Sequence, residues 1–227
     1  MKNLSIVIPM RKGSKRVVNK NKKKFLNKTL FHYKIEIVKS FNIPIIVDTD
    51  DLEIIQYAKE LGVETRLRPE YFASDKCSNS EYHEYLGKTS PSDYLMVAQV
   101  TNPLIKRSTY LDAIDRFKKN NCNGIMSVKK VQTFLWNDKE PINYTLDKAV
   151  NSQNLPIYWA PTFGLVICNK ESLIKDKNLI TKDTKIYELD EFESIDIDTN
   201  FDFWLAEQAL KFKGEMILEI NGKILKS

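Results

Sequence analysis

The chain has 227 residues, of which 42% are hydrophobic and 11% aromatic, values that are ordinary for one globular domain and argue against disorder. No apolar stretch approaches the roughly 20 residues that cross a bilayer, and the first ten residues hold too few apolar side chains for a secretory signal. Three isolated cysteines and two histidines follow no zinc-site spacing, so we expect a reduced, cytoplasmic protein without a membrane partner.

The net charge of +5 is distributed unevenly along the chain. Residues 1–35 contain eleven Lys or Arg and no acidic residue, whereas residues 186–210 contain eight acidic residues and no Lys or Arg. The first block suits an anion and the second suits a cation, although a block of like charge is often only a solvated surface.

Strand and helix patterns alternate through the first hundred residues. Short apolar runs predict buried strands over residues 4–9, 43–51, 63–69 and 94–100. Amphipathic spacing predicts helices over residues 29–41 and 52–62, the second with Asp50 or Asp51 as its N-cap.

The second half continues this alternation with one interruption. We expect a helix over residues 108–120 capped by Ser108, strands over 124–131 and 163–169, and a helix over 202–214 that ends at Gly214. Residues 132–160 lose the pattern and predict an excursion that packs against a partner chain or covers a substrate. We expect Trp204 in the core, and His32 and His83 on the surface or in helix packing.

The alternation predicts an α/β fold, in which a parallel sheet carries helices on both faces. Sheets of this kind bind ligands at the carboxyl ends of their strands. The polar segments that follow Pro9, Asp48 and Gln99 should therefore lie along one edge of the sheet.

The segment "IPMRKGSKRVVNKN" contains a single glycine, Gly13, so it matches neither the phosphate loop GxxxxGK[ST] nor the dinucleotide pattern GxGxxG. Arg11 and Lys15 are suited to clamp phosphates, with backbone N–H groups near Gly13 and Ser14 adding donors. The alternatives are an exposed basic loop and a nucleic-acid patch. The absence of interleaved aromatic residues and the acidic remainder of the chain argue against nucleic acid.

The segment "ESIDIDTNFDFWLAE" places Asp196 and Asp198 two residues apart in an extended stretch, so both carboxylates point to the same side. Two neighbouring carboxylates repel unless a cation compensates them, and Mg²⁺ commonly takes one or two carboxylates together with nucleotide phosphates. The alternative is that Asp198 or Asn200 only caps the following helix.

Four segments in order, "IPMRKGSKRVVNKN", "LRPEYFASD", "QVTNPL" and "ESIDIDTNFDFWLAE", resemble the signature segments of the acylneuraminate cytidylyltransferase family. That family includes enzymes that activate sialic, Kdo, pseudaminic and legionaminic acids. The resemblance implies a Rossmann-like nucleotidyltransferase with three α/β/α layers and a mostly parallel sheet. It also implies one domain over residues 1–227, a homodimer, and an insertion near 132–160 that contributes to the dimer contact and the sugar site.

The resemblance further implies the reaction. CTP and a 2-keto sugar acid would give a CMP-sugar and pyrophosphate, by in-line attack of the anomeric hydroxyl on the α-phosphorus with Mg²⁺ or Mn²⁺. Transfer of another nucleotide such as GMP, a non-sialic acceptor, and a non-catalytic nucleotide-binding protein remain open as alternatives.

Carried over by motif, the resemblance implies three kinds of site residue. Catalytic roles fall to Arg11, Lys15 and Asp196, and the metal ligands are Asp196 and Asp198. Nucleotide contacts fall to Arg11, Ser14, Lys15, Asn21, Arg68, Asn79 and Gln99. Sugar contacts fall to Gln99, Thr101, Lys129 and Phe163.

The sugar side departs from the family pattern. "SQNLPIYWAPTFGLVI" lacks the arginines that sialic acid enzymes carry in this segment, and "QVTNPLI" stands where "QPTSPLR" is common. We therefore expect an acceptor other than N-acetylneuraminic acid, whose carboxylate would meet Lys129 or Lys130.

Overall fold

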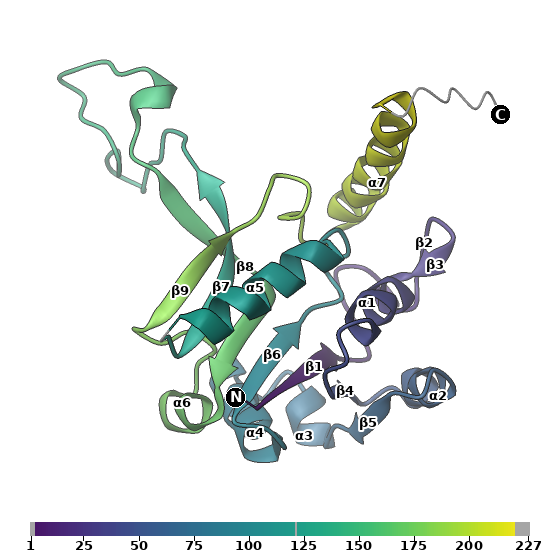
Figure 1. Cartoon of the computed structure of the whole chain (residues 1–227). Coiled ribbons are helices and arrows are strands. Elements are labelled where there is room, and N and C mark those ends of the chain that lie inside the picture. The colour runs from purple at the N-terminus through teal and green to yellow at the C-terminus, as the bar shows by residue number, and fades with distance from the viewer. Residues whose placement is uncertain (1–2, 121, 221–227) are drawn as a thin grey trace.

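The computed structural model describes residues 3–120 and 122–220, with side chains through residue 212 (Figure 1). Its centre is a seven-stranded sheet of order β5-β4-β1-β6-β8-β7-β9, in which β8 alone runs antiparallel to its neighbours. The strands are β1 (Leu4–Met10), β4 (Ile45–Thr49), β5 (Glu64–Leu67), β6 (Tyr94–Ala98), β7 (Gly124–Val131), β8 (Tyr158–Asn169) and β9 (Thr184–Glu188). A separate pair is formed by β2 (Lys24–Phe25) and β3 (Lys28–Thr29).

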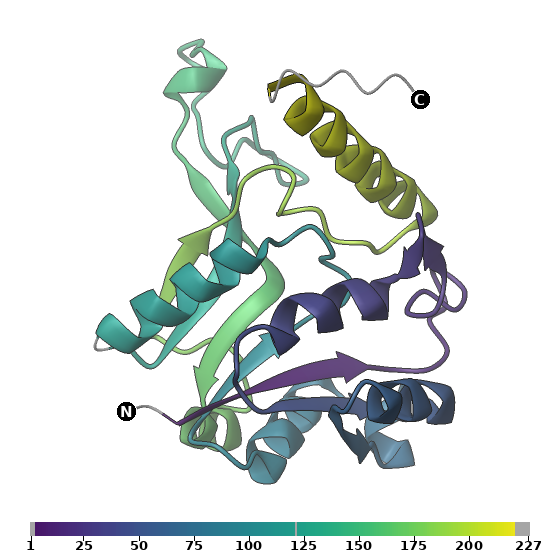
Figure 2. The ribbon, with the colours of Figure 1, turned by 45° about the vertical axis from the view of Figure 1, so that its right-hand side comes forward.

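Helices cover both faces of the sheet, as Figures 1 and 2 show, so the predicted three-layer α/β/α fold is confirmed. They are α1 (Leu30–Lys39), α2 (Leu52–Glu60), α3 (Glu70–Ala73), α4 (Asn79–Thr89), α5 (Arg107–Lys119), α6 (Lys170–Asp176) and α7 (Asn200–Ile220), with a 3₁₀ turn at Ser152–Asn154. One buried cluster joins Phe31 of α1 and Phe117 of α5 to the sheet. A second cluster joins Leu86 of α4 and Leu173 of α6 to the opposite face.

The central strand β1 determines where ligands can approach. All seven of its residues are buried, because it pairs in parallel with β4 on one side and β6 on the other and has helices on both faces. Ile6 lies opposite Ile45 and Met96, so the carboxyl ends of the three strands lie at the same edge. The convergence expected from the sequence is therefore present.

Three predicted boundaries are wrong. Lys106, not Ser108, is the N-cap of α5, and no side chain caps that helix. The last helix continues through Gly214 to Ile220, since one glycine costs a helix only about 1 kcal/mol and the rest of α7 is long. β8 begins at Tyr158, five residues earlier than predicted, because it pairs there with Val131 of β7.

Between β7 and β8 the chain leaves the sheet as an arm, which we define as residues 132–157 (Figure 1). Its exposed large apolar side chains are Phe134, Trp136, Ile142, Leu146 and Ile157. Residue 160, where the sequence predicts the end of the insertion, is the third residue of β8. The assignment of this arm to a dimer contact stays a prediction.

The last helix also differs from expectation. Trp204, predicted to be in the core, is 53% exposed on α7, and the inward face of that helix is instead formed by Phe203 and Ala206. No helix in the described ranges combines the length and the apolar character that a bilayer crossing would need.

Candidate functional site

Two adjoining pockets lie at the carboxyl edge of β1 and β6. The first pocket has a volume of about 470 Å³, the second has about 680 Å³, and they share Arg16, Gln99 and Thr101. The first pocket is lined by the predicted residues Arg11, Ser14, Lys15, Asn21, Arg68, Gln99 and Thr101. The second is lined by the predicted residues Asn79, Gln99, Thr101, Phe163, Asp196 and Asp198. The structure therefore brings together nearly all residues that the sequence singled out.

The basic loop after β1 directs two cations at one carboxylate. Nη1 of Arg11 lies 2.9 Å from Oδ1 of Asp75, and Nζ of Lys15 lies 2.5 Å from Oδ2 of the same side chain. The hydrogen bonds from Lys15 and then Arg11 hold the pKa of Asp75 below its usual range. An anion that replaced this exposed carboxylate would meet both cations.

The loop itself has a defined conformation. Gly13 has φ +78°, in the left-handed region that favours glycine, so the turn needs this residue. Nδ2 of Asn21 donates to the carbonyl of Arg11 at 3.2 Å, and the backbone N–H of Lys12 donates to Asp50 at 2.7 Å. Asn21 thus supports the loop in addition to lining the first pocket.

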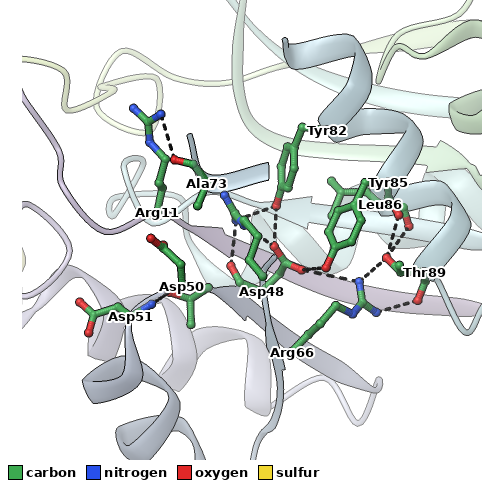
Figure 3. A network of polar contacts seen from close by, with 12 residues as sticks. Arg11, Asp48, Asp50, Asp51, Arg66, Ala73, Tyr82, Tyr85, Leu86 and Thr89 are labelled. Atoms are coloured by element: carbon green, nitrogen blue, oxygen red, sulfur yellow. Dashed lines mark hydrogen bonds and ion pairs between the residues drawn. The ribbon is translucent and has the colours of Figure 1, made fainter. Parts of the chain in front are cut away.

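On the other side of the first pocket, a buried carboxylate organises two arginines and two tyrosines (Figure 3). Asp48 is fully buried, and its Oδ1 accepts from Nε of Arg68 at 2.6 Å and from the hydroxyl of Tyr82 at 2.9 Å. Its Oδ2 accepts from the hydroxyl of Tyr85 at 3.2 Å and lies 3.7 Å from Nη1 of Arg66. The guanidinium of Arg68 is therefore fixed in orientation where it lines the pocket.

The acidic pair lies at the second pocket. Oδ1 of Asp196 is buried and has no hydrogen-bond partner among the described residues. Burial raises the pKa of Asp196, and the neighbouring Asp198 adds to this increase. Oδ1 of Asp198 lies 2.8 Å from Nη2 of Arg16 and 3.7 Å from Nζ of Lys20. A buried acceptor with no donor beside a second carboxylate is suited to a bound cation.

Capping of α7 does not explain these carboxylates. The helix begins after Thr199, whose Oγ1 accepts from the backbone N–H of Asp202 at 3.2 Å. Asp202 in turn accepts from the backbone N–H of Thr199 at 2.7 Å, which completes a capping box. The alternative that Asp198 or Asn200 caps the helix is therefore wrong, and the carboxylate of Asp198 instead meets Arg16 and Lys20.

The residues present fit a hard divalent cation as a partial ligand set. Asp196 and Asp198 offer carboxylate oxygens, but no group of three or more His, Cys, Asp or Glu residues in the described chain is arranged around a metal position. An ion bound here would need further oxygens from a ligand and from water, which is usual for Mg²⁺ beside phosphates.

Lys129 does not join the other predicted residues. It lies with Lys130 on the strand that leads into the arm, and both line a different pocket together with Glu188, Asp190 and Glu191. This pocket is therefore separate from the two pockets that hold the other predicted residues.

Sequence reasoning missed three residues at the site. Asp75 closes the motif "LRPEYFASD", which is the only signal that pointed to it. His83 and Lys177 line the second pocket, although neither lies in a motif. Burial lowers the pKa of His83, and Nζ of Lys177 lies 2.8 Å from Glu84.

A larger hollow, of about 950 Å³, lies behind the basic loop and contains none of the predicted site residues. Lys22, which lines it, is already paired with Asp51 at 3.1 Å and Glu53 at 2.7 Å. The two smaller pockets bring together predicted residues of both charge signs, so we place the candidate site there.

Comparison with known proteins identifies the family of the chain. A family described as "Cytidylyltransferase" matches residues 5–208. An N-acylneuraminate cytidylyltransferase of Escherichia coli is 28% identical over 210 residues, covering 88% of this chain and 50% of the relative. This chain thus spans about half the length of the first relatives that it matches. A pseudaminic acid cytidylyltransferase of Campylobacter jejuni is 24% identical over 231 residues, covering 95% of this chain and 99% of the relative.

Among solved structures, a CMP:2-keto-3-deoxy-manno-octonic acid synthetase in complex with CTP superposes with a TM-score of 0.63. The match covers 92% of this chain and 99% of that chain at 13% identity, a level that supports a shared fold only.

Proposed function

This chain belongs to the cytidylyltransferase family, and on that premise we propose that it transfers CMP from CTP to a nonulosonic or related 2-keto sugar acid. The observation that carries the proposal is the meeting of the two pockets at Gln99 and Thr101, with cations on one side and a carboxylate pair on the other. Cationic side chains bind the phosphates of a nucleoside triphosphate, and carboxylates bind the metal ion that accompanies it.

In this proposal the triphosphate takes the place of Asp75. Arg11 and Lys15 already converge on one anionic group, so they exchange a carboxylate for phosphate oxygens without moving far. Arg68, which is held by Asp48, lines the part of the first pocket where the cytosine base would lie. Ser14 and Asn21 of the basic loop line the same pocket.

The sugar acid occupies the second pocket. Its anomeric hydroxyl oxygen attacks the α-phosphorus in line, a new P–O bond forms, and the bond to the bridging oxygen of pyrophosphate breaks. Asp196 is placed to take the hydroxyl proton, because its carboxylate lines the second pocket beside Thr101. Arg11 and Lys15 offset charge on the leaving pyrophosphate.

A divalent cation held by Asp196 and Asp198 would supply further neutralisation of the phosphate oxygens. The support for this assignment is the buried Oδ1 of Asp196, which has no donor among the described residues, together with the release of Asp198 from any capping role. Mg²⁺ is the proposed ion and Mn²⁺ its substitute.

Recognition of the acceptor carboxylate falls to Lys177 in this proposal. Lys177 lines the second pocket next to His83 and Asn178, whereas Lys129 lines another pocket. Glu84, its present partner, is also paired with Lys88 at 2.6 Å, so its carboxylate is shared between two ammonium groups.

The proposal is tested by measuring pyrophosphate release with each of the four ribonucleoside triphosphates across a panel of 2-keto sugar acids. We expect release with CTP, with at least one nonulosonic acid, and with Mg²⁺ but not with EDTA. Release with GTP instead would favour transfer of GMP. Binding of CTP without turnover of any acid would favour a non-catalytic nucleotide-binding protein.

We also propose that the arm (residues 132–157) contacts a second copy of the chain. The support is its set of exposed apolar side chains, such as Phe134, Trp136 and Ile142, on a segment that extends from the sheet. Sedimentation equilibrium tests this: Trp136→Ser together with Ile142→Ser should convert a dimer into a monomer, and a monomeric wild-type protein would contradict the proposal.

A further inference from the structure

Lys34 on α1 is fully buried, yet it contacts no carboxylate in the described part of the chain. Its Nζ donates to the carbonyl of Asn102 at 2.9 Å and to the hydroxyl of Tyr110 at 2.5 Å, and it lies 4.8 Å from the centre of the Tyr110 ring. Burial lowers the pKa of this ammonium to about 7. A buried lysine of this kind is costly, so it needs an explanation beyond packing.

The carbonyl of Asn102 lies in the segment that follows β6 and lines the site. The amide Nδ2 of Asn102 donates to the carbonyl of Ile195 at 3.2 Å, and the carbonyl of Thr101 accepts from the backbone N–H of Ile197 at 2.8 Å. These two bonds flank Asp196. The position of the acidic pair therefore depends on the position of Thr101 and Asn102.

The hydroxyl of Tyr110 continues the network toward the acceptor side. It donates to the carbonyl of Gly164 at 3.3 Å, and that carbonyl also accepts from the backbone N–H of Gln99 at 3.3 Å. A Cβ at position 164 would lie 2.5 Å from Cγ of Asn102, so the two segments are packed without free space. A shift at Lys34 would move Gln99, Asn102 and Gly164 together.

We propose that Lys34 is a positioning residue, which holds the segment 99–102 against β8 and thereby sets the geometry of Asp196 and Asp198 for binding a divalent cation. The inference rests on the proposed function, because the ion acts beside the triphosphate. Lys34 touches neither pocket and acts only through Asn102 and Tyr110.

The test replaces Lys34 by methionine, which has similar length and no donor. Without the ammonium, the buried carbonyl of Asn102 loses its partner and the segment can relax. We expect the Mg²⁺ concentration for half-maximal turnover to rise about tenfold, with the KM for CTP unchanged. The Kd of Mn²⁺ for the protein without nucleotide, measured by electron paramagnetic resonance, should rise by the same factor.

Lys39→Met is the matched control, since Lys39 lies on the same helix, is exposed and donates to the carbonyl of Leu61 at 2.5 Å. It should leave both metal measurements unchanged. A partly unfolded sample would lower the number of Mn²⁺ sites but not their Kd, so the two measurements separate misfolding from positioning. A folded Lys34→Met protein with wild-type Kd for Mn²⁺ would overturn the proposal.

If Lys34→Met does not fold, Tyr110→Phe decides the question, because it keeps the ring and removes only the hydroxyl between Lys34 and Gly164. We expect the Kd of Mn²⁺ to rise about threefold, the effect of one hydrogen bond, and an unchanged Kd would overturn the proposal. If the wild-type protein consumes no CTP with any sugar acid, the proposed function fails, but the Mn²⁺ comparison still tests Lys34 separately.

Discussion

The two pockets are built in different ways. Around the first, the fully buried Asp48 fixes Arg68 and Tyr82 by short hydrogen bonds that join β4, the segment after β5, and α4. Around the second, Phe163 is 40% exposed and the side chain of Lys177 is 49% exposed. The Asp48 side of the first pocket is therefore part of the buried structure, whereas Phe163 and Lys177 of the second pocket can change with little cost to the core.

The largest loss of activity should follow from removing one charge from either pocket, Lys15 from the first or Asp198 from the second. Lys15→Ala or Asp198→Ala should each lower kcat/KM for CTP by a factor of about 10² to 10³, because a preorganised charge at the phosphates is lost. Lys15 is 75% exposed and Asp198 is 43% exposed, so thermal unfolding should stay as in the wild type. Pyrophosphate release measures the first effect and calorimetry the second.

Lys12→Ala is the control for that experiment, since Lys12 lies in the same loop, is exposed and lines neither pocket. Full turnover by either Lys15→Ala or Asp198→Ala would contradict the assigned roles.

The next effect concerns stability. Asp48→Asn leaves Arg68 buried beside a neutral amide, and removing one partner of a buried pair costs about 3 to 5 kcal/mol. We expect a loss of that size in the free energy of unfolding, measured in urea, together with weaker CTP binding. Asp115→Asn, at an exposed pair with Lys119, should cost less than about 1 kcal/mol. Equal costs at the two positions would contradict the special role of the buried Asp48.

A moderate effect should appear on the acceptor side. Lys177→Ala should raise the KM for the sugar acid about fivefold and lower the free energy of unfolding by less than about 1 kcal/mol, since the pair with Glu84 that is also lost is exposed. Steady-state kinetics at saturating CTP measure this. A larger effect from Lys129→Ala would instead support the expectation drawn from the sequence.

The smallest effect should come from Asp75. Asp75→Asn removes an exposed carboxylate that competes with phosphate for Arg11 and Lys15, and such a pair is worth about 0.2 to 1 kcal/mol. We expect the KM for CTP to fall about twofold to fivefold at low ionic strength and the difference to disappear in 1 M salt. A rise in the KM would show that Asp75 contributes to binding.

The sequence predicts which residues line the first pocket well, because that information is local. β1 is an uninterrupted apolar run, and Arg11, Lys15 and Asn21 follow it directly, so their common edge is set by strand direction alone. Asp196 and Asp198 are distant in sequence, but their spacing and charge pointed to the same chemistry, and the capping box at Thr199 resolves the alternative that the sequence left open.

The acceptor side is less predictable because it depends on long-range packing. Nothing near Lys177 or His83 in the sequence indicates that the ends of α4 and α6 meet at the second pocket. β9 (Thr184–Glu188) went unrecognised because its single buried residue, Tyr187, gives no apolar run. Trp204 was expected in the core because α7 carries apolar side chains on more than one face. Only the tertiary packing decides which of these faces is buried.

The turn at positions 163 and 164 has a consequence for altering what the protein accepts. Phe163 lines the second pocket with φ 56°, a conformation that costs a side chain about 1 kcal/mol, so asparagine or glycine would fit the backbone better than the present ring. The next position admits no side chain, since a Cβ there would collide with Asn102. A mutant library aimed at new sugar acids should therefore randomise position 163, keep position 164 as glycine, and find its most stable members among those that have lost the aromatic ring.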